Sequence, residues 1–323
     1  VSDTSITNVS FYEDSWTPNL RLGVGFLYNI KDSISIGLET GLNYNFEIND
    51  DDTDWAGTAD LEDSNNAGER WSIPLMFTVR RASIKAMPTR PLKAVVDEDN
   101  DSFYIIGGSS AVFFSPPDRD EYPIVDGAGT VLSSSNLLNF DNDDIAVVGN
   151  IGFGYRFASS IVSRSKLLGE NLRFETLASY FESKDRHDSH ISGNAITGFD
   201  LENNDLRQVL DTGAFVDYES DYDFIDVNFR LKTDYTIFDD RLFVSPYVGG
   251  MYARFEQDFS TRLTNDSDST DYYLLKEELK TNYWGATVGA ELKVNVFGRL
   301  HAFLDGMTSF MFAHTDLDVN QNA

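Results

Sequence analysis

Apolar and polar side chains alternate along most of the chain. From Leu20 to Ile30 the even-numbered residues are Leu, Leu, Val, Phe, Tyr and Ile, and the residues between them are Arg, Gly, Gly, Leu and Asn. The next segment, Ile34 to Phe46, repeats the alternation with Ser, Gly, Glu and Asn as its polar or small set. A period of two residues predicts β-strands with one face in an apolar environment.

The alternation continues downstream in Trp71–Val79, Tyr104–Phe114, Val147–Phe157, Leu172–Tyr180, Ile225–Tyr235, Tyr247–Phe255, Trp284–Val296 and, less regularly, Leu300–Phe312. Strands of soluble sandwiches also alternate, but they usually run for only about five or six residues. A tilted strand that crosses the hydrocarbon of a bilayer needs about 9–11 residues, which suits most of these segments better. We therefore favour a transmembrane β-barrel over a soluble sandwich.

Aromatic residues lie near the ends of these segments, where a membrane barrel carries its interfacial girdles. The candidates for such girdles are Tyr28, Tyr44, Phe46, Tyr155, Phe157, Tyr180 and Tyr235.

The links between segments are of two kinds, and the two kinds alternate along the chain. Short or less acidic links lie at 31–32, 80–96, 158–169, 238–240 and 297–298, and long polar links at 49–69, 116–144, 183–220 and 258–280. A meander through a bilayer predicts short turns on one side and long loops on the other. We assign the acidic loops to the cell exterior and the short turns to the periplasm.

The fold expected is all-β: a transmembrane antiparallel up-and-down β-barrel of about 10–12 strands with long acidic extracellular loops. If the turn at 31–32 is periplasmic, a strand should precede Leu20, and Ile6–Tyr12 is the candidate. Residues 1–323 are expected to form a single outer-membrane β-barrel domain. The start at Val1 and the end at Asn322-Ala323 indicate a mature chain that is trimmed at its C-terminal end.

Composition narrows the partners. The apolar content is 41%, yet no run approaches the roughly 20 apolar residues of a membrane-spanning helix. A net charge of -28 argues against nucleic acid, because phosphates require a basic face. The absence of cysteine permits an exported protein. The expected partners are the lipid bilayer, the lipopolysaccharide of a bacterial outer membrane, and a protein that docks on the extracellular loops.

Charged residues of both signs fall on the polar set of positions, which in a barrel faces the lumen. These are Arg21, Glu39, Arg156, Arg173, Glu175, Asp226, Arg230, Lys232, Asp234, Arg254, Glu256, Glu291 and Lys293. In a narrow barrel such groups pair with one another and fill the interior, whereas a polar lumen open to solutes needs more strands. At ten to twelve strands we favour the plugged interior.

No catalytic, cofactor or metal site is predicted. His187 and His190 flank Asp188 in an acidic stretch, where they suit a base or a metal site, but no strand-anchored third partner is evident. His301 and His314 have even less around them. The acidic runs at 97–101 and 266–271 lack the Gly and the bidentate Glu of a calcium loop.

The amino-acid sequence of some stretches also resembles that of a known family. Leu20–Tyr44, Ile73–Phe77, Phe103–Gly108 and Asp144–Phe157 resemble porin-family or PorT-like outer-membrane β-barrel proteins of the Bacteroidetes type. The resemblance implies a barrel fold and no particular ligand, since members of such families share a fold and differ in task. The chain departs from the pattern in its large acidic loops, its hairpins beyond an eight-stranded core and its ending away from a terminal aromatic residue.

Three classes of function follow. The leading hypothesis is a non-enzymatic outer-membrane barrel that acts as a membrane anchor or as a docking surface through its extracellular loops. The second is a passive diffusion porin for small solutes, and the third is an outer-membrane rim hydrolase.

Overall fold

The computed structural model of the chain is built from β-strands. It describes residues 3–9, 15–31, 34–46, 70–82, 102–114, 125–126, 144–157, 171–192, 196–200, 205–210, 213–237, 242–265 and 272–322. Within these ranges, no helix has the length and apolar character needed to cross a membrane.

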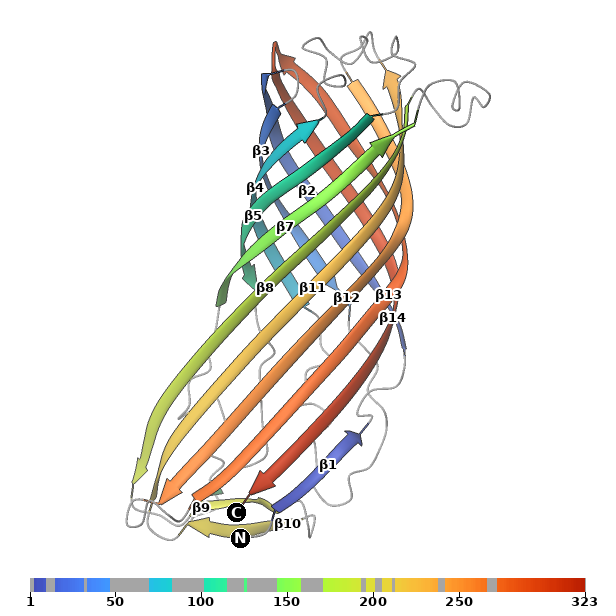
Figure 1. Ribbon diagram of the computed structural model, residues 1–323. Helices are drawn as coiled ribbons and strands as arrows, with labels where there is room; N and C mark the ends of the chain where they lie inside the picture. The colour runs from blue at the N-terminus through green and yellow to red at the C-terminus, as the bar shows by residue number, and fades with distance from the viewer. Residues whose placement is uncertain are drawn as a thin grey trace.

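The strands of the main sheet close into a barrel. Its staves are β2 (Ser15–Lys31), β3 (Ile34–Asn45), β4 (Arg70–Ala82), β5 (Ser102–Phe114), β7 (Asp144–Arg156), β8 (Asn171–Ser192), β11 (Gly213–Ile237), β12 (Leu242–Asn265), β13 (Tyr272–Phe297) and β14 (Leu300–Asn322). Each stave is antiparallel to the next, and β14 pairs back with β2 to close the ring (Figure 1). The predicted up-and-down barrel is confirmed, with ten strands.

A tight turn joins β13 to β14 at one end of the barrel, which we call the turn end. The turn between β13 and β14 contains Gly298 with a φ of 55°. This left-handed conformation is one that glycine adopts without steric cost, and it suits the short hairpins that match strand twist. The predicted short link at 297–298 is thereby confirmed as a hairpin turn.

The outer surface near the turn end is apolar and exposed. On β2, the side chains of Leu20, Leu22, Val24 and Phe26 are each about half exposed, at 49–52%. Every other stave also presents exposed apolar side chains; examples are Leu38, Leu75, Ile105, Ile151, Tyr180, Phe229, Val248, Val288 and Phe310. A closed ring of exposed apolar side chains is costly in water and favourable against lipid chains. We call this ring the apolar belt.

Aromatic residues lie at both margins of the apolar belt. At the margin away from the turn end, Phe312 contacts Trp16 and Trp284, with ring centroids 5.7 and 5.0 Å apart. Near the turn end, Tyr155 packs edge-to-face on Phe157 at 5.2 Å. Amphipathic aromatic rings favour the interface between hydrocarbon and water, so these two margins mark the two faces of the bilayer.

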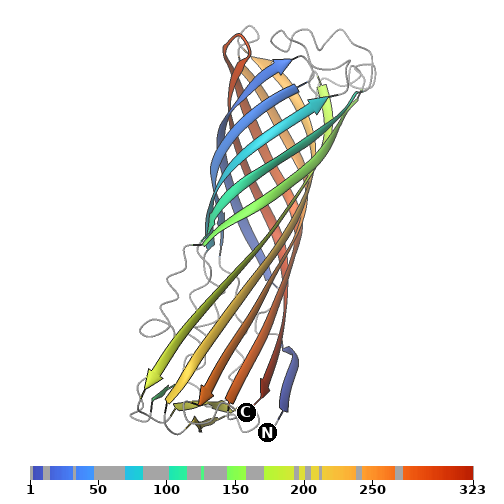
Figure 2. The same cartoon turned by 60° about the vertical axis from the view of Figure 1, so that its left-hand side comes forward.

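Five of the strands, β8 and β11–β14, continue far beyond the apolar belt (Figures 1 and 2). β7 pairs with β8 only as far as Tyr180, whereas β8 and β11 stay paired to Ser192 and Gly213. We call this part the strand extension. The long links predicted at 183–220 and 258–280 are therefore wrong, because most of those residues lie in strands.

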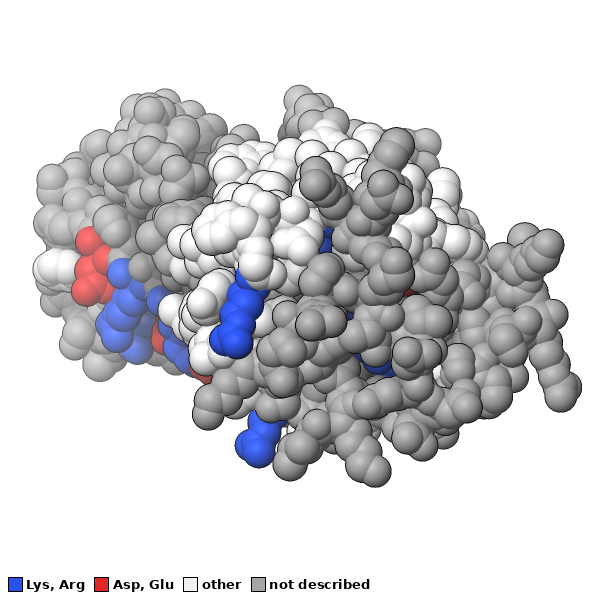
Figure 3. All heavy atoms as spheres, turned by 90° about the horizontal axis from the view of Figure 1, so that it is seen from above, with Lys and Arg blue, Asp and Glu red and all other residues white. Residues whose placement is uncertain are grey.

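The polarity of the two faces inverts in the strand extension. Its outer face carries charged residues such as Lys184, Arg186 and Asp221, while Leu263 and Tyr273 on its inner face are buried. Seen from the turn end, basic and acidic side chains lie together on the projecting part (Figure 3). A strand that leaves the bilayer meets water on its outer face, so polar residues replace the apolar ones there.

Four short strands lie outside the ring of staves. β1 (Asp3–Val9) pairs with the last residues of β14, beyond the point where β2 begins, so the strand predicted near Ile6 is not a further stave. A small sheet of β6 (Val125–Asp126), β9 (Ile196–Asp200) and β10 (Asp205–Leu210) forms separately. Both chain ends lie at the end of the strand extension (Figure 1). The predicted links at 49–69 and 116–144 fall outside the described residues, except for β6 and Asp144.

Candidate functional site in the barrel lumen

The side chains that alternate with the apolar belt point into the barrel. The structure places these predicted charged residues inside: Arg21, Glu39, Arg156, Arg173, Glu175, Asp226, Arg230, Lys232, Asp234, Glu291 and Lys293. They come from strands β2, β3, β7, β8, β11 and β13, so groups distant in sequence share one interior.

Arg254 and Glu256 are exceptions, since the structure places them on the outer face of β12. Their side chains are 41% and 26% exposed, whereas Ala253 before them and Gln257 after them are buried. The sequence prediction took Tyr247 and Ala253 as the outward, apolar set. The error arose because Arg254 and Glu256 lie just past the apolar belt, where the outer face is already in water.

Arg173 is the centre of one interior cluster. Its guanidinium lies 2.5 Å from Asp234 and 3.6 Å from Glu175. The hydroxyl of Tyr104 donates a hydrogen bond to Glu175, and the hydroxyl of Ser245 donates one of 2.7 Å to Asp234. Both carboxylates are therefore neutralised and hydrogen-bonded, as buried charges require.

Lys232 on β11 joins this cluster to β13, which lies beyond β12 in the ring. Its ammonium, in a side chain that is only 4% exposed, lies 2.7 Å from Glu291 on β13 and 3.9 Å from Glu175 on β8. One buried cation thus contacts two carboxylates from strands that are not neighbours, and it links β8, β11 and β13 inside the barrel.

A second group of charges lies along β2, β3, β11 and β14. Arg21 pairs with Glu39 at 3.4 Å, and Arg230 with Asp305 at 3.9 Å. The hydroxyl of Tyr247 donates to Asp305 at 3.1 Å, and the Arg230 guanidinium lies 4.9 Å from the centre of the Tyr247 ring. This combination of ion pair, hydrogen bond and cation–π contact holds Arg230 in one place.

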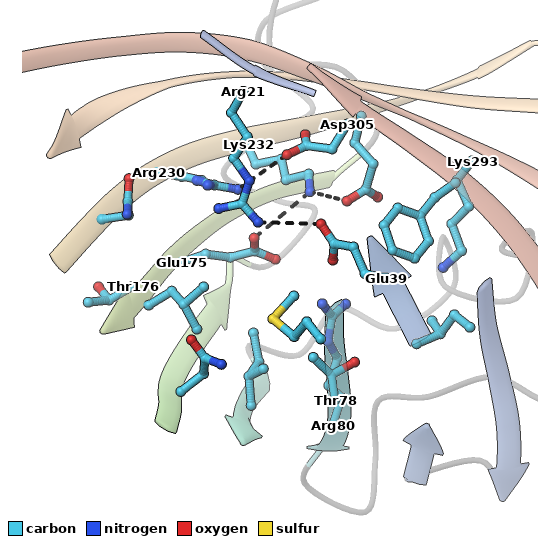
Figure 4. A pocket seen from close by; sticks show the side chains of 18 residues that line it. Arg21, Glu39, Thr78, Arg80, Glu175, Thr176, Arg230, Lys232, Lys293 and Asp305 are labelled. Carbon is cyan, nitrogen blue, oxygen red and sulfur yellow. Dashed lines mark hydrogen bonds and ion pairs between the residues drawn. The ribbon is translucent and has the colours of Figure 1, made fainter. Parts of the chain in front are cut away.

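A cavity of about 100 Å³ remains between these groups (Figure 4). It has room for only a few water molecules, because each occupies about 30 Å³ in the liquid. Charged residues dominate one part of its wall, and the apolar residues Leu27, Met76, Ile106, Leu177 and Phe303 complete it. At this level the lumen is a narrow, charged chamber.

Four residues of the site lie outside the predicted set: Arg80, Tyr104, Tyr247 and Asp305. Arg80 was assigned to a link, Tyr104 and Tyr247 to the apolar set, and Asp305 to the irregular last segment. A sequence signal for Asp305 was present, because the polar His301 and Ser309 share its parity, while Leu304 and Phe310 occupy the alternate positions. No comparable sequence signal indicated that Tyr104 and Tyr247 face the lumen, since a tyrosine ring suits either face of a barrel strand.

The histidines of the chain do not meet at a common site among the residues that the structure describes. His301 is buried, with Nε2 3.3 Å from the side-chain nitrogen of Asn29, and His314 lies 3.5 Å from Asp316. His187 and His190 fall on β8, but their side chains are outside the described set. Asp188 between them is 3.5 Å from Arg186. The described side chains include no group of three His, Cys, Asp or Glu that is suited to a metal ion. The acidic runs at 97–101 and 266–271 lie outside the described residues.

Comparison with known proteins adds little to this picture. No protein-family model matches the sequence, and no curated protein matches it. Among solved structures, the toluene transporter TodX of Pseudomonas putida is 8% identical, with 97% of this chain and 91% of that chain covered and a TM-score of 0.20. The toluene transporter TbuX of Ralstonia pickettii is 8% identical, over 94% and 90% of the two chains, with a TM-score of 0.14.

OccK9 of Pseudomonas aeruginosa is 9% identical, over 95% of this chain and all of that one, with a TM-score of 0.14. Likenesses this weak carry no weight for function. The architecture itself, a closed barrel with a lipid-facing belt and a charged interior, is that of an outer-membrane β-barrel. The narrower resemblance to PorT-like proteins stays a prediction.

Proposed function

We propose that this chain is a non-enzymatic, integral outer-membrane protein that anchors a docking surface, formed by the strand extension and its connecting loops, to the bilayer. The observation that carries the proposal is the continuation of β8 and β11–β14 as one paired sheet beyond the apolar belt. A barrel that only had to span the bilayer would not need strands of 22 to 26 residues, since about 9–11 are enough.

The interior of the barrel supports an anchoring role over a diffusion pore. Ten strands give a barrel only slightly wider than those of eight, whose interiors side chains fill, and far narrower than porins of 16–18 strands. The ion pairs centred on Arg173 and Lys232 fill interior space along β8, β11 and β13 that a solute would have to pass. The extracellular placement of the acidic side, contact with lipopolysaccharide and a docked protein belong to the same proposal.

Single-channel recording in planar bilayers tests the anchor against the porin alternative. The purified barrel is first shown to be folded by its faster migration on SDS gels before heating. We expect no conductance steps from the folded protein. Lys232→Ala combined with Glu291→Ala, which removes the central pair, is the matched positive control and should give steps. Regular steps from the unmodified protein would replace the anchor with a diffusion porin.

A separate experiment tests the docking role. Two variants, each with a photo-crosslinking residue at a single position, are compared in intact cells. Position 186, on the outer face of the strand extension, should give a discrete crosslinked protein product. Position 24, in the apolar belt, is the control and should give only lipid adducts. Equal protein adducts at both positions, or none at position 186, would contradict the docking role.

A further inference from the structure

Two of the cations that line the lumen cavity make no close ion pair with the carboxylates that the structure describes. Arg80 on β4 and Lys293 on β13 both border the cavity (Figure 4). Among the residues that the structure describes, neither lies within 4.0 Å of a carboxylate, which is the distance that defines the ion pairs of the other cavity cations. The two strands are separated by β3, β2 and β14, so the cations approach the cavity from different sides of the barrel.

The acids that border the cavity are all engaged elsewhere. Glu39 pairs with Arg21, Asp305 with Arg230, and Glu175 and Glu291 with Lys232. Glu291, the acid that acts most strongly on Lys293, is itself only 2.7 Å from Lys232. Five cations and four acids line this chamber, which leaves it positive in a chain whose net charge is -28.

Arg80 and Lys293 also act on each other as like charges. Like charges in a poorly solvated interior raise the free energy of the folded state, and the penalty is offset when an opposite charge lies between them. Glu175 acts on Arg80 and Glu291 acts on Lys293, but both carboxylates also neutralise Lys232, at 3.9 and 2.7 Å, so an anion from solution is the natural complement of the remaining positive charge.

The neighbours of the two cations indicate what kind of anion fits. Ile106 lies opposite Arg80 in the β4–β5 register, and Phe303 lies opposite Lys293 in the β13–β14 register. Both Ile106 and Phe303 line the cavity, as does Thr78, whose hydroxyl is a hydrogen-bond donor. The part of the wall around the two cations therefore also presents a hydroxyl and apolar side chains.

We propose that this cavity binds a small monocarboxylate, with the carboxylate between Arg80 and Lys293 and a short hydrocarbon tail against Ile106 and Phe303. A guanidinium and an ammonium both donate strong, charge-assisted hydrogen bonds to a carboxylate. The cavity volume of about 100 Å³ limits the ligand to a few heavy atoms, in the range from acetate to butyrate. The apolar part of the wall disfavours phosphate, whose oxygens all need donors. The site is independent of the docking role, and either proposal can fail alone.

Calorimetric titration of the folded barrel in detergent micelles with sodium propionate tests this site, with sodium chloride at equal ionic strength and protein-free micelles as blanks. We expect saturable binding by the unmodified protein. Arg80→Met and Lys293→Met each remove one charge at similar side-chain volume and should weaken binding at least tenfold. Arg80→Lys and Lys293→Arg keep the charge and should retain most of the affinity.

Lys184→Met is the matched control, because it removes a cation from the outer face of the strand extension; it should bind propionate as the unmodified protein does. The faster migration of unheated protein on SDS gels shows for each variant that the barrel has formed. The absence of saturable binding, or equal binding by the Met variants at positions 80 and 293, would overturn the site. Saturable binding of phosphate without binding of propionate would overturn the assignment to a monocarboxylate.

Discussion

At the scale of single residues, the interior is organised around cations that each satisfy more than one acid. Lys232 contacts Glu291 and Glu175, and Arg173 contacts Glu175 and Asp234. Such shared pairs make the interior sensitive to the loss of one member, because the remaining charges stay buried without compensation.

Lys232→Met should destabilise the barrel strongly. The change leaves Glu291 without its nearest cation in a buried site, which typically costs about 3–5 kcal/mol. Lys184→Met breaks a pair in which the lysine side chain is 59% exposed, and it should cost less than about 1 kcal/mol. Guanidinium titrations that follow the fraction of folded protein on unheated gels measure both. Adding Glu291→Gln to Lys232→Met should recover part of the loss, and equal midpoints for the two single variants would contradict the central role of Lys232.

At the scale of elements, the closeness of neighbouring strands depends on glycine at particular positions. A Cβ atom at Gly249 of β12 would lie 1.8 Å from the backbone oxygen of Phe229 on β11. At Gly306 of β14, by contrast, no atom lies within 4 Å of a Cβ atom.

Gly249→Ala should therefore weaken the pairing of β11 with β12. The strands must separate locally to admit the methyl group, and overpacking of this kind typically costs about 1–3 kcal/mol. Gly306→Ala should behave as the unmodified protein. Folding yield into detergent micelles, followed by gel migration, compares the two. A normal yield and stability for Gly249→Ala would show that β12 has room to shift.

The strand extension carries a row of acids across its outer face. Asp221, Asp258 and Glu278 lie directly opposite one another on β11, β12 and β13, with Lys184 beyond Asp221 and Asp318 beyond Glu278. Partial burial raises the pKa of Asp258 above its ordinary value of 3.8, and the charges of Glu278, Glu256 and Asp221 raise it further, while Lys280 opposes them. The charged form of Asp258 is thus disfavoured in the folded protein.

Because the folded pKa of Asp258 is raised, its contribution to stability is complete below pH 3.8 and is lost as the pH rises through the folded pKa. Asp258→Asn should make the protein more stable than the unmodified chain near neutral pH, and the difference should disappear in acid. Asp217→Asn, which removes the partner of Arg186 at 2.7 Å, should not stabilise the protein. Guanidinium midpoints measured across this pH range provide the comparison, and a constant difference between Asp258→Asn and the unmodified chain would contradict it.

The sequence predicted which side chains face inward best for strands whose outer face meets a single environment, lipid, along its whole length. β2 and β3 lie within the apolar belt, and their alternation placed Arg21 and Glu39 on the inner side. β12 passes from lipid to water between Val248 and Arg254, so no single face of it is apolar throughout. Alternation alone could not locate that crossing, and it therefore failed for Arg254, for Glu256 and for the strands beyond Ser183. The cavity pair of Arg80 and Lys293 depends on barrel closure, which no local pattern contains.

At the scale of the whole molecule, both chain ends, the end of β12 and the start of β13 lie on the same side of the apolar belt (Figure 1). The end of β2 and the start of β3 lie on the other side. This arrangement fixes which parts of the chain share a compartment, whichever way the barrel is inserted.

Epitope tags placed after Ala323 and between residues 265 and 272 should be labelled together on intact cells, if the acidic side faces outward as we predict. A tag between residues 31 and 34 should be labelled only after the membrane is opened. Labelling of the turn tag alone on intact cells would reverse the predicted orientation. Labelling of all three tags on intact cells would contradict a barrel whose two ends lie on opposite sides of the membrane.

The inversion of polarity along β8 and β11–β14 also determines how deeply the barrel is immersed. A strand rises about 3.4 Å per residue, so a vertical slip of only a few residues would carry Arg254 and Lys184 into hydrocarbon in one direction. In the other direction it would expose Trp284 and its neighbours to water. The cost of such a charge rises from about 0–1 kcal/mol near the interface towards about 2–4 kcal/mol at the bilayer midplane, and several charges would move at once. The sequence of these strands therefore fixes how deeply the barrel lies in the bilayer and how far the strand extension projects from the membrane surface.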